Sequence, residues 1–250
     1  SIIRANLLLL ITAAIWGLAF VAQRVGMGYV GPFTFNGVRF LLGSLSLVPL
    51  LLYFRNANQF LAKRSASAFL PGLLAGTVLF VASSFQQIGL VTTTAGKAAF
   101  ITSLYIVMVP AIGMFLGHKI GKGTWVGCLL AVAGLYLLCI KETASIQSGD
   151  LLEMIGALFF AFHILIIGKY SRRVDVLELS FVQFLTCGVL STATALITEN
   201  IIFSSIAAAA IPILYGGICS VGIAYTLQVM GQKHAPPAHA AIIMSMEAVF

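Results

Sequence analysis

The sequence predicts an all-α polytopic membrane protein made of two inverted repeats of five transmembrane helices. Apolar residues make up 60% of the chain and charged residues only 8%, whereas charged residues are about a quarter of a soluble protein. The apolar stretches are about 20 residues long and do not alternate with polar residues, which is typical of membrane helices and not of barrel strands. Residues 93–105, TTAGKAAFITSLY, return as APPAHAAIIMSME at 235–247, and such self-similarity indicates a repeat.

The repeat can be followed along most of the chain. A shift of 142 residues aligns three pairs: Lys97 with His239, Ser103 with Ser245, and Tyr105 with Glu247. A shift of 144 aligns Trp16 with Phe160, and residues 38–41 with 182–185. We therefore predict a first repeat at 6–140 and a second at 149–250. Five spans are an odd number, so the second repeat enters the membrane from the opposite side, as in many transporters.

Nine spans follow in order. We place them at 6–28, 32–54, 67–91, 94–117, 122–140, 150–170, 176–198, 207–232 and from 236 onward. Turn residues separate them: Gly31-Pro32 precedes the second span, residues 148–150 open the sixth, and Pro236-Pro237 opens the ninth. By comparison with the first repeat, a tenth span is expected after Phe250.

Basic residues are distributed unevenly between the two sides. Ten of the fourteen Lys and Arg residues fall at one side: Arg4, Arg55, Lys63, Arg64, Lys119, Lys122, Lys169, Arg172, Arg173 and Lys233. The loops of the other side contain Lys141 beside the acidic Glu142, Asp150 and Glu199. The positive-inside rule then predicts a cytoplasmic N-terminus.

Five stretches of the sequence occur in a recognisable order: AAIWGLAFVAQRVG, GVRFLLG, TTTAGKAAFITSLYIVMVP, GKGTWVGCLLAVAGLYLL and AAIIMSMEAVF. Together they resemble the EamA family of the drug/metabolite transporter superfamily. The resemblance implies ten helices in two inverted halves, and export of amino acids or other small metabolites across the cell inner membrane. The family often has Glu-Pro in the ninth helix, where this chain has Glu247-Ala248, so a kink there is not assured.

Glu247 is an acidic residue inside a predicted span. It lies about eleven residues into the ninth span, near the midplane at about 1.5 Å per residue. A carboxylate there costs about 2.5–3.5 kcal/mol on insertion scales, which makes it a functional candidate. We expect it to bind a substrate amine or couple a proton; the alternative is a structural ion pair with Arg39 or Lys97.

The first two spans contribute polar faces. Asn36 and Arg39 share one face of the second span, and Arg39 can hold a carboxylate or phosphate bidentately. Trp16 and Gln23 share a face of the first span, where Trp16 would be a cavity wall. Packing or charge pairing is the alternative for these residues. Arg24 near the span end is explained by snorkelling to the headgroups.

Further candidates come from the remaining spans. Lys97 and Tyr105 share a face of the fourth span, where Lys97 is alternatively an interfacial lysine. Uncharged candidates for the cavity are Gln87, Tyr225 and Gln228, each alternatively an interhelical hydrogen bond. His163, inside the sixth span, would relay protons or else rest as a neutral histidine bonded to a neighbouring helix.

The motifs absent from the sequence exclude other classes. There is no GxxxxGK[ST], no GxSx and no HExxH, so we expect no ATP drive, no enzyme activity, no cofactor and no metal. The expected partners are a small-molecule substrate and the lipid bilayer, without nucleic acid. Small-residue spacings such as Gly72 to Gly76 allow close helix contacts within the chain or in a homodimer.

The charges inside the spans suggest a substrate. Arg24, Arg39 and Lys97 against Glu247 leave an excess of two positive charges, which favours carboxylate or phosphate groups. We therefore expect alternating-access export of an amino acid or similar metabolite from a midplane site, with Arg39 at its anionic group and Glu247 at its amine or at a proton. The alternatives are an exchanger of phosphate-ester or nucleotide-type anions and a non-transporting lipid-handling or scaffold protein.

Overall fold

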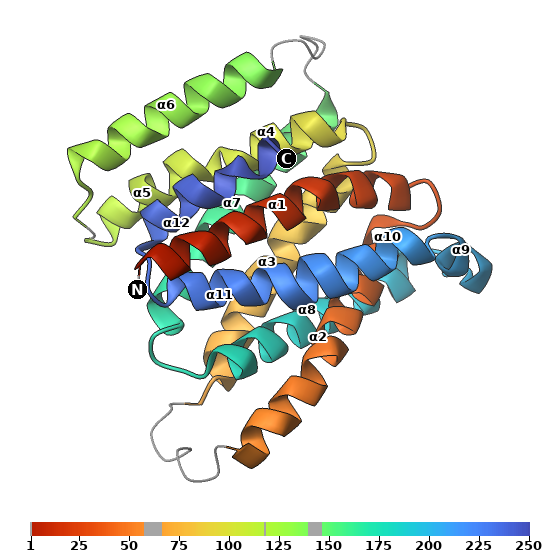
Figure 1. Cartoon of the computed structure of the whole chain (residues 1–250). Helices are drawn as coiled ribbons and strands as arrows, with labels where there is room; N and C mark the ends of the chain where they lie inside the picture. The colour runs from red at the N-terminus through yellow and green to blue at the C-terminus, as the bar shows by residue number, and fades with distance from the viewer. Residues whose placement is uncertain (1, 58–66, 118, 140–146) are drawn as a thin grey trace.

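The chain folds into helices that pack side by side, and most of them run along one common direction (Figure 1). The computed structural model describes residues 2–57, 67–117, 119–139 and 147–250. The first repeat contains α1 (Ile2–Gly26), α2 (Pro32–Ala57), α3 (Phe69–Gly89), α4 (Ala95–Ser103), α5 (Tyr105–Phe115) and α6 (Lys122–Cys139). The second contains α7 (Ser148–Tyr170), α8 (Val176–Thr198), α9 (Phe203–Ala208), α10 (Ala210–Leu214), the π-helix η1 (Tyr215–Tyr225), α11 (Thr226–Gln232), α12 (Pro237–Met244) and the 3₁₀-helix η2 (Ser245–Ala248).

Seven helices within the described residues are long and apolar enough to cross a membrane. They are Ile2–Gly26, Pro32–Phe54, Phe69–Gly89, Ala95–Phe115, Ser148–Tyr170, Val176–Thr198 and Ala210–Gln232. These correspond to the first four and the sixth to eighth predicted spans. The fifth predicted span corresponds to α6, and the ninth to α12 followed by η2.

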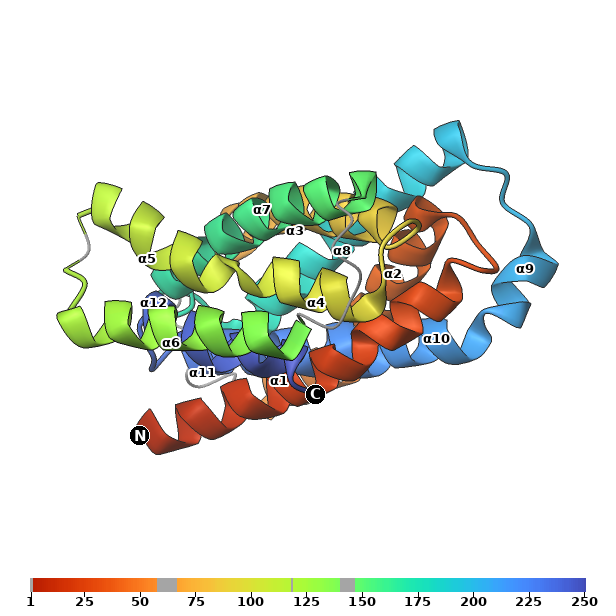
Figure 2. The same ribbon diagram turned by 90° about the horizontal axis from the view of Figure 1, so that it is seen from above.

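Equivalent helices of the two repeats pack in equivalent ways. The central pair is α2 against α8, each the second helix of its repeat. On one side α3 packs along α7, and on the other α10, η1 and α11 pack along α1. Exchanging the repeats therefore reproduces the same set of contacts. Figure 2 shows the two sides, with α3 and α7 in one layer and α1, α10 and α11 in the other.

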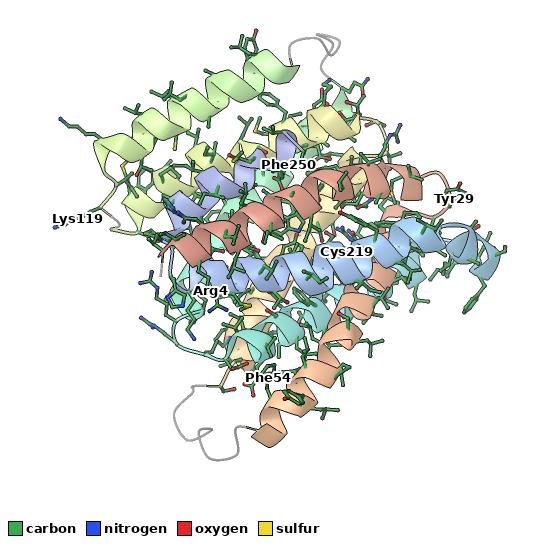
Figure 3. The ribbon with its side chains drawn as sticks, in the orientation of Figure 1. Arg4, Tyr29, Phe54, Lys119, Cys219 and Phe250 are labelled. Atoms are coloured by element: carbon green, nitrogen blue, oxygen red, sulfur yellow. The ribbon has the colours of Figure 1, made fainter. Side chains whose placement is uncertain are left out.

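The two ends of the helix bundle carry different residues (Figure 3). Arg4 and Lys119 lie at one end, which we call the Arg4 end, and Tyr29 lies at the other, which we call the Tyr29 end. Some of the charged residues used above to orient the chain lie outside the described part of the structure. They are Lys63, Arg64, Lys141, Glu142 and the side chain of Arg55.

Glu199 closes the N-terminus of α2 at the Tyr29 end. Its carboxylate accepts hydrogen bonds from the backbone N–H groups of Phe33 and Thr34, both at 2.8 Å, and from the Thr34 hydroxyl at 2.6 Å. The first N–H groups of a helix have no partner within it and attract negative charge. Glu199 follows directly after α8, so this cap fastens the central α2 and α8 pair.

The predicted fourth span, 94–117, is interrupted near its middle. The Leu104 N–H bonds to the Ile101 carbonyl, three residues back, which tightens the chain between α4 and α5. In α5, Pro110 lacks the N–H that would bond the Ile106 carbonyl, and the Cys128 thiol donates to that carbonyl at 3.3 Å. The equivalent break in the second repeat follows Met244, where α12 tightens into η2 without a proline. Both breaks therefore lie at related positions, next to Tyr105 and Glu247.

Candidate functional site

A small cavity lies between the two repeats. Its volume is about 30 Å³, which is room for water and well below the roughly 300–1,000 Å³ of ligand pockets. Its lining residues come from both repeats: Trp16, Ala19, Phe20, Gln23, Arg39, Gln86, Thr102, Tyr105, Phe160, Ser220, Tyr225 and Glu247. The central cavity of this structure is therefore too small to hold an organic solute without widening.

Arg39 is the cation on the cavity wall. It is only 2% exposed, and no carboxylate oxygen of the described residues lies within 4.0 Å of its nitrogens. The guanidinium lies over the rings of Phe40 and Phe35, at 4.9 and 5.6 Å from their centroids. Its Nε donates to the Asn36 Oδ1 at 3.0 Å, and the Asn36 amide donates to the Ser83 carbonyl at 3.0 Å. Asn36 thus orients the guanidinium from behind instead of lining the cavity.

Glu247 supplies a carboxyl group to the same cavity. Its side chain is buried and belongs to η2, directly after the break at Met244. The Ser103 hydroxyl lies 3.5 Å from Oε1 and also donates to the Ser245 carbonyl at 3.2 Å. The two repeat-related breaks therefore touch each other beside the cavity.

The close approach of η2 depends on a glycine. A Cβ atom at Gly17 would lie 2.7 Å from the Glu247 carbonyl oxygen, closer than side chains tolerate. Gly17 follows Trp16 on α1, so the same turn of α1 presents the indole to the cavity and accepts the η2 backbone.

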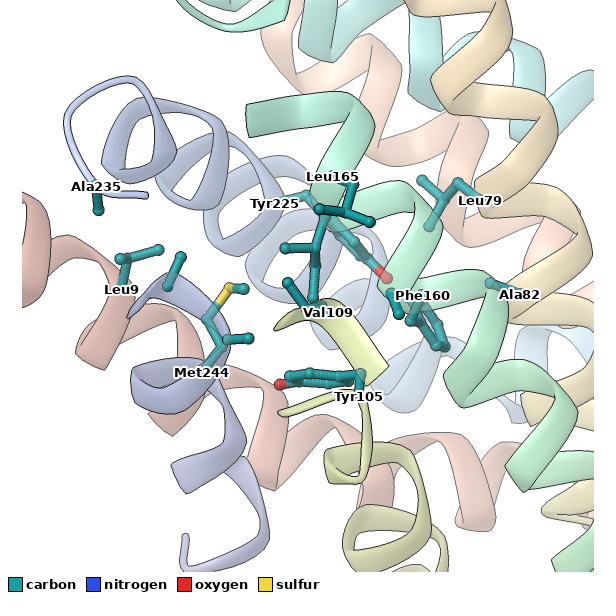
Figure 4. Close-up of a cluster of buried hydrophobic side chains, with 14 of the residues drawn as sticks. Leu9, Leu79, Ala82, Tyr105, Val109, Phe160, Leu165, Tyr225, Ala235 and Met244 are labelled. Carbon is teal, nitrogen blue, oxygen red and sulfur yellow. The ribbon is translucent and has the colours of Figure 1, made fainter. Parts of the chain in front are cut away.

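Aromatic side chains form much of the remaining wall. Trp16 and Tyr225 have ring centroids 4.6 Å apart, and the Trp16 indole donates to the Ser220 carbonyl at 3.3 Å. Ser220 and Tyr225 belong to η1, a geometry that is rare and often found at functional sites. Tyr105, Phe160 and Tyr225 also belong to the main buried cluster shown in Figure 4. The buried Tyr105 hydroxyl lies beside the Glu247 carboxyl in the cavity wall.

The structure brings six of the predicted residues into the cavity wall and leaves five outside it. Trp16, Gln23, Arg39, Tyr105, Tyr225 and Glu247 line the cavity. Asn36, Gln87, Lys97, Gln228 and His163 do not.

The residues outside the wall have structural contacts. Gln87 donates to the Gln23 carbonyl at 3.4 Å, and Gln228 donates to the Gln232 side chain at 3.0 Å. His163 is buried behind Tyr225 and bonds through Nε2 to the Gln183 side chain at 2.9 Å. This contact is the interhelical histidine bond named above as the alternative to a proton relay.

Lys97 pairs with an acid that the sequence placed in an outer loop. Its ammonium lies 2.6 Å from the Asp150 Oδ2, and the Thr93 hydroxyl donates to Oδ1 at 2.6 Å. Glu247 therefore makes neither of the ion pairs expected as alternatives, since no Arg39 or Lys97 nitrogen of the described residues lies within 4.0 Å of it.

The excess of positive charge predicted from the sequence is wrong. Glu153 on α7 is a further carboxylate that is completely buried, and Asp150 neutralises Lys97. Arg24 is exposed and donates to the Leu90 and Val91 carbonyls. The sequence did contain a signal for Glu153, since an acid within a predicted span is unusual. The cavity is left with one cation and one carboxylate.

A second hollow of about 360 Å³ lies at the Tyr29 end. It is lined by the connection between α1 and α2 and by residues around α9, including Tyr29, Asn200 and Ser205. No Asp, Glu, Lys or Arg belongs to its lining. The central cavity, which is lined by a guanidinium and a carboxyl group, is therefore the candidate site.

Comparisons with known proteins agree with this architecture. The EamA-like transporter family profile matches residues 3–140 and again 147–250. An uncharacterized transporter of Archaeoglobus fulgidus is 32% identical over 98% of this chain and 75% of its own length. The uncharacterized transporter YoaV of Bacillus subtilis is 22% identical over 92% of this chain and 80% of its own.

A solved crystal structure has the same fold, with a TM-score of 0.78 over 98% of this chain and 84% of the other, at 19% identity. The predicted fold class, an all-α polytopic membrane protein with two inverted repeats, is confirmed. The chain belongs to the EamA-like transporter family, within the drug/metabolite transporter superfamily, and is a multi-pass membrane transporter.

Proposed function

We propose that the protein is a secondary transporter that exports an amino acid or a similar small zwitterion. The observation that carries this proposal is the presence of a guanidinium and a carboxyl group in one cavity: Arg39 and Glu247 line it together, yet they do not form an ion pair with each other. A guanidinium binds a carboxylate through two parallel hydrogen bonds, and a carboxylate binds an ammonium. A zwitterion satisfies both groups at once.

The charge balance argues against a phosphate ester as substrate. A phosphate group brings about two negative charges, and the wall offers a single guanidinium with a carboxylate on the same cavity. Lys97, which would be the second cation, is held by Asp150 outside the wall. A lipid-handling or scaffold protein would have an apolar cavity, so the buried Arg39 and Glu247 argue against that alternative too.

Alternating access would use the two helix breaks. The Ser103 contacts with Ser245 and Glu247 hold the breaks together in the closed state, and broken helices at the midplane are typical of transporter binding sites. Separating α4 from η2 widens the cavity toward one side. In this scheme the protein spans the cell inner membrane with the Arg4 end on the cytoplasmic side, as the basic residues at that end favour.

The experiment is counterflow in proteoliposomes with single radiolabelled solutes. The panel contains amino acids, the matching carboxylic acids without an amine, the matching amines without a carboxylate, and phosphate esters. We expect exchange with one or more amino acids and none with the phosphate esters. Exchange confined to phosphate esters, or absent for every solute, would contradict the proposal.

A further inference from the structure

Glu153 is a buried acid that the cavity does not use directly. It is completely buried on α7, its Oε2 accepts a hydrogen bond from the Thr102 hydroxyl at 3.1 Å, and its Oε1 has no partner within the described residues. No cationic nitrogen of those residues lies within 4.0 Å. An uncompensated buried charge costs several kcal/mol, so a carboxyl in this position is suited to carrying a proton.

The neighbouring acid on the same helix has the opposite character. Asp150, one turn earlier, accepts bonds from Lys97, from the Thr93 hydroxyl and from the Gln147 backbone N–H at 3.0 Å. All of its polar needs are met by the protein. Asp150 is therefore held in an ion pair near the Tyr29 end. Glu153, in contrast, has one carboxyl oxygen without a hydrogen-bond partner among the described residues.

Glu153 is one bond away from the cavity. Thr102 lines the cavity and donates to Glu153, while Gln86, also in the wall, donates to the Thr102 oxygen at 3.2 Å. The next residue along α4, Ser103, contacts Glu247. Two adjacent hydroxyls at the end of α4 thus connect to two buried acids of the second repeat, one behind the wall and one in it.

The inverted repeat contains its own control for Glu153. With the shift of 144, Glu153 corresponds to Leu9, and with the shift of 142, Thr102 corresponds to Met244. Leu9 and Met244 are both completely buried and lie near each other in the apolar cluster of Figure 4. The packing also matches, since Gly89 lies against Glu153 as the equivalent Gly231 lies against Leu9. The scaffold therefore accepts an apolar side chain here, and the fold does not require the carboxyl.

The elements packed around Glu153 carry few ionisable side chains. Asp150 lies on its own helix, Lys97 on α4, Glu247 on η2 and Tyr105 on α5, while α3, packed along α7, has no ionisable side chain. The polar groups run from the Tyr29 end through Asp150 and Glu153 to Thr102. On the Arg4 side, the positions equivalent to Glu153 and Thr102 are the apolar Leu9 and Met244, and the pair equivalent to Asp150 and Lys97 is Asn6 and His239.

We propose that Glu153 is a proton-binding site that couples substrate export to proton entry. Its carboxylate takes a proton from water at the Tyr29 end, and the O–H bond breaks again when the opened site lets the proton leave at the Arg4 end. This inference rests on the proposed transport function and assigns the two acids different tasks: Glu247 binds the substrate amine and Glu153 binds the proton.

The first test observes the proton itself. Infrared difference spectra of the purified protein between acidic and alkaline buffer report protonated carboxyl groups without any substrate. We expect a carboxyl band that is present in the wild type, in Glu247→Gln and in the exposed control Glu178→Gln, and is absent in Glu153→Leu and Glu153→Gln. A spectrum that both Glu153 variants leave unchanged would overturn the proposal.

The second test measures coupling in proteoliposomes, with the amino acid that gives the largest counterflow. An imposed pH gradient should drive accumulation of that amino acid by the wild type and by Glu178→Gln. Glu153→Leu and Glu153→Gln should retain counterflow but lose the response to the gradient. Wild-type counterflow that no pH gradient can drive, or an undiminished response in both variants, would overturn the proton site while leaving the transporter intact. Absence of any counterflow would instead contradict the transport function, and the infrared spectra would still decide the proton site.

Discussion

The two ends of the bundle are fastened by equivalent pairs of residues with different chemistry. At the Tyr29 end, Lys97 of α4 forms an ion pair with Asp150 of α7 at 2.6 Å. At the Arg4 end, His239 of α12 bonds to Asn6 of α1 at 2.9 Å. The repeat shifts of 142 and 144 place His239 where Lys97 is, and Asn6 where Asp150 is. The equivalent contact between helices is therefore an ion pair at one end and a hydrogen bond between an amide and an imidazole at the other.

The two repeats therefore preserve the position of this contact but not its chemistry. Both pairs join the first helix of one repeat to the fourth helix of the other. In the proposed alternating-access cycle, one pair would separate while the other holds. Variants that make one repeat resemble the other test this view, and four follow in order of expected effect.

Removing the cation of the cavity should have the largest effect. Arg39→Gln gives the first repeat the residue of its equivalent, Gln183. A hydrogen bond to a charged group contributes about 1.5–3 kcal/mol. The amino acid concentration that half-saturates counterflow should therefore rise about 10- to 100-fold. Arg39→Lys keeps the charge without the planar fork and should fall between the variant and the wild type. Unchanged half-saturation in Arg39→Gln would remove Arg39 from the site.

Replacing the ionic pair by its counterpart should lower stability. Asp150→Asn gives the Tyr29 end the amide that Asn6 supplies at the other, and removes the carboxylate charge from the Lys97 and Asp150 pair. We expect a loss of about 1.5–3 kcal/mol in the free energy of unfolding, measured by thermal unfolding in detergent. Glu178→Gln, an exposed acid on α8, is the control and should change little. Equal melting temperatures for Asp150→Asn and the wild type would show that the ion pair is not a fastening.

Making the aromatic wall symmetric should have a smaller effect. Trp16→Phe copies Phe160 and removes the bond between the indole and the Ser220 carbonyl. A neutral hydrogen bond contributes about 0.5–1.5 kcal/mol, so the half-saturating amino acid concentration should rise by about 2- to 12-fold with a similar maximal rate. A fall in the maximal rate alone would instead place Trp16 in the conformational change.

The weakest expected effect is at the Arg4 end. Asn6→Ala removes the partner of His239, and both side chains are only partly buried, so we expect a loss of at most about 1 kcal/mol. Comparison with Asp150→Asn in the same thermal assay ranks the two fastenings. A larger loss from Asn6→Ala would reverse the order that their chemistry predicts.

Sequence reasoning recovered the scaffold more fully than the site. Apolar stretches and the returning pattern at 93–105 and 235–247 predict helices and an inverted repeat, because the membrane allows few other structures. The central cavity was anticipated through Arg39 and Glu247, since ionisable residues in a span stand out. The partner of Lys97 was not predictable in the same way. The position of Lys97 in the sequence is compatible with a cavity residue and with an ion pair, and only the packing of α4 on α7 brings it to Asp150.

The helix irregularities also escaped prediction. Nothing in the residues around Leu104 or Ser245 marks a break, and the π-helical turn of η1 places Ser220 and Tyr225 at the cavity without a local sequence signal. These features arise from contacts between the repeats. Glu153 was accessible from sequence as an acid inside a span, but its importance emerges only when its equivalent, Leu9, shows that the position packs without a charge.

The most direct measurement crosses the two charged residues with three matched solutes. Counterflow is recorded for an amino acid, its analogue without the amine and its analogue without the carboxylate, in the wild type, Arg39→Gln and Glu247→Gln. The account predicts that Arg39→Gln loses the advantage conferred by the carboxylate, and that Glu247→Gln loses the advantage conferred by the amine. Equal losses of counterflow for all three solutes in both variants would contradict it, because Arg39 and Glu247 would then support the cavity without binding the carboxylate or the amine of the substrate.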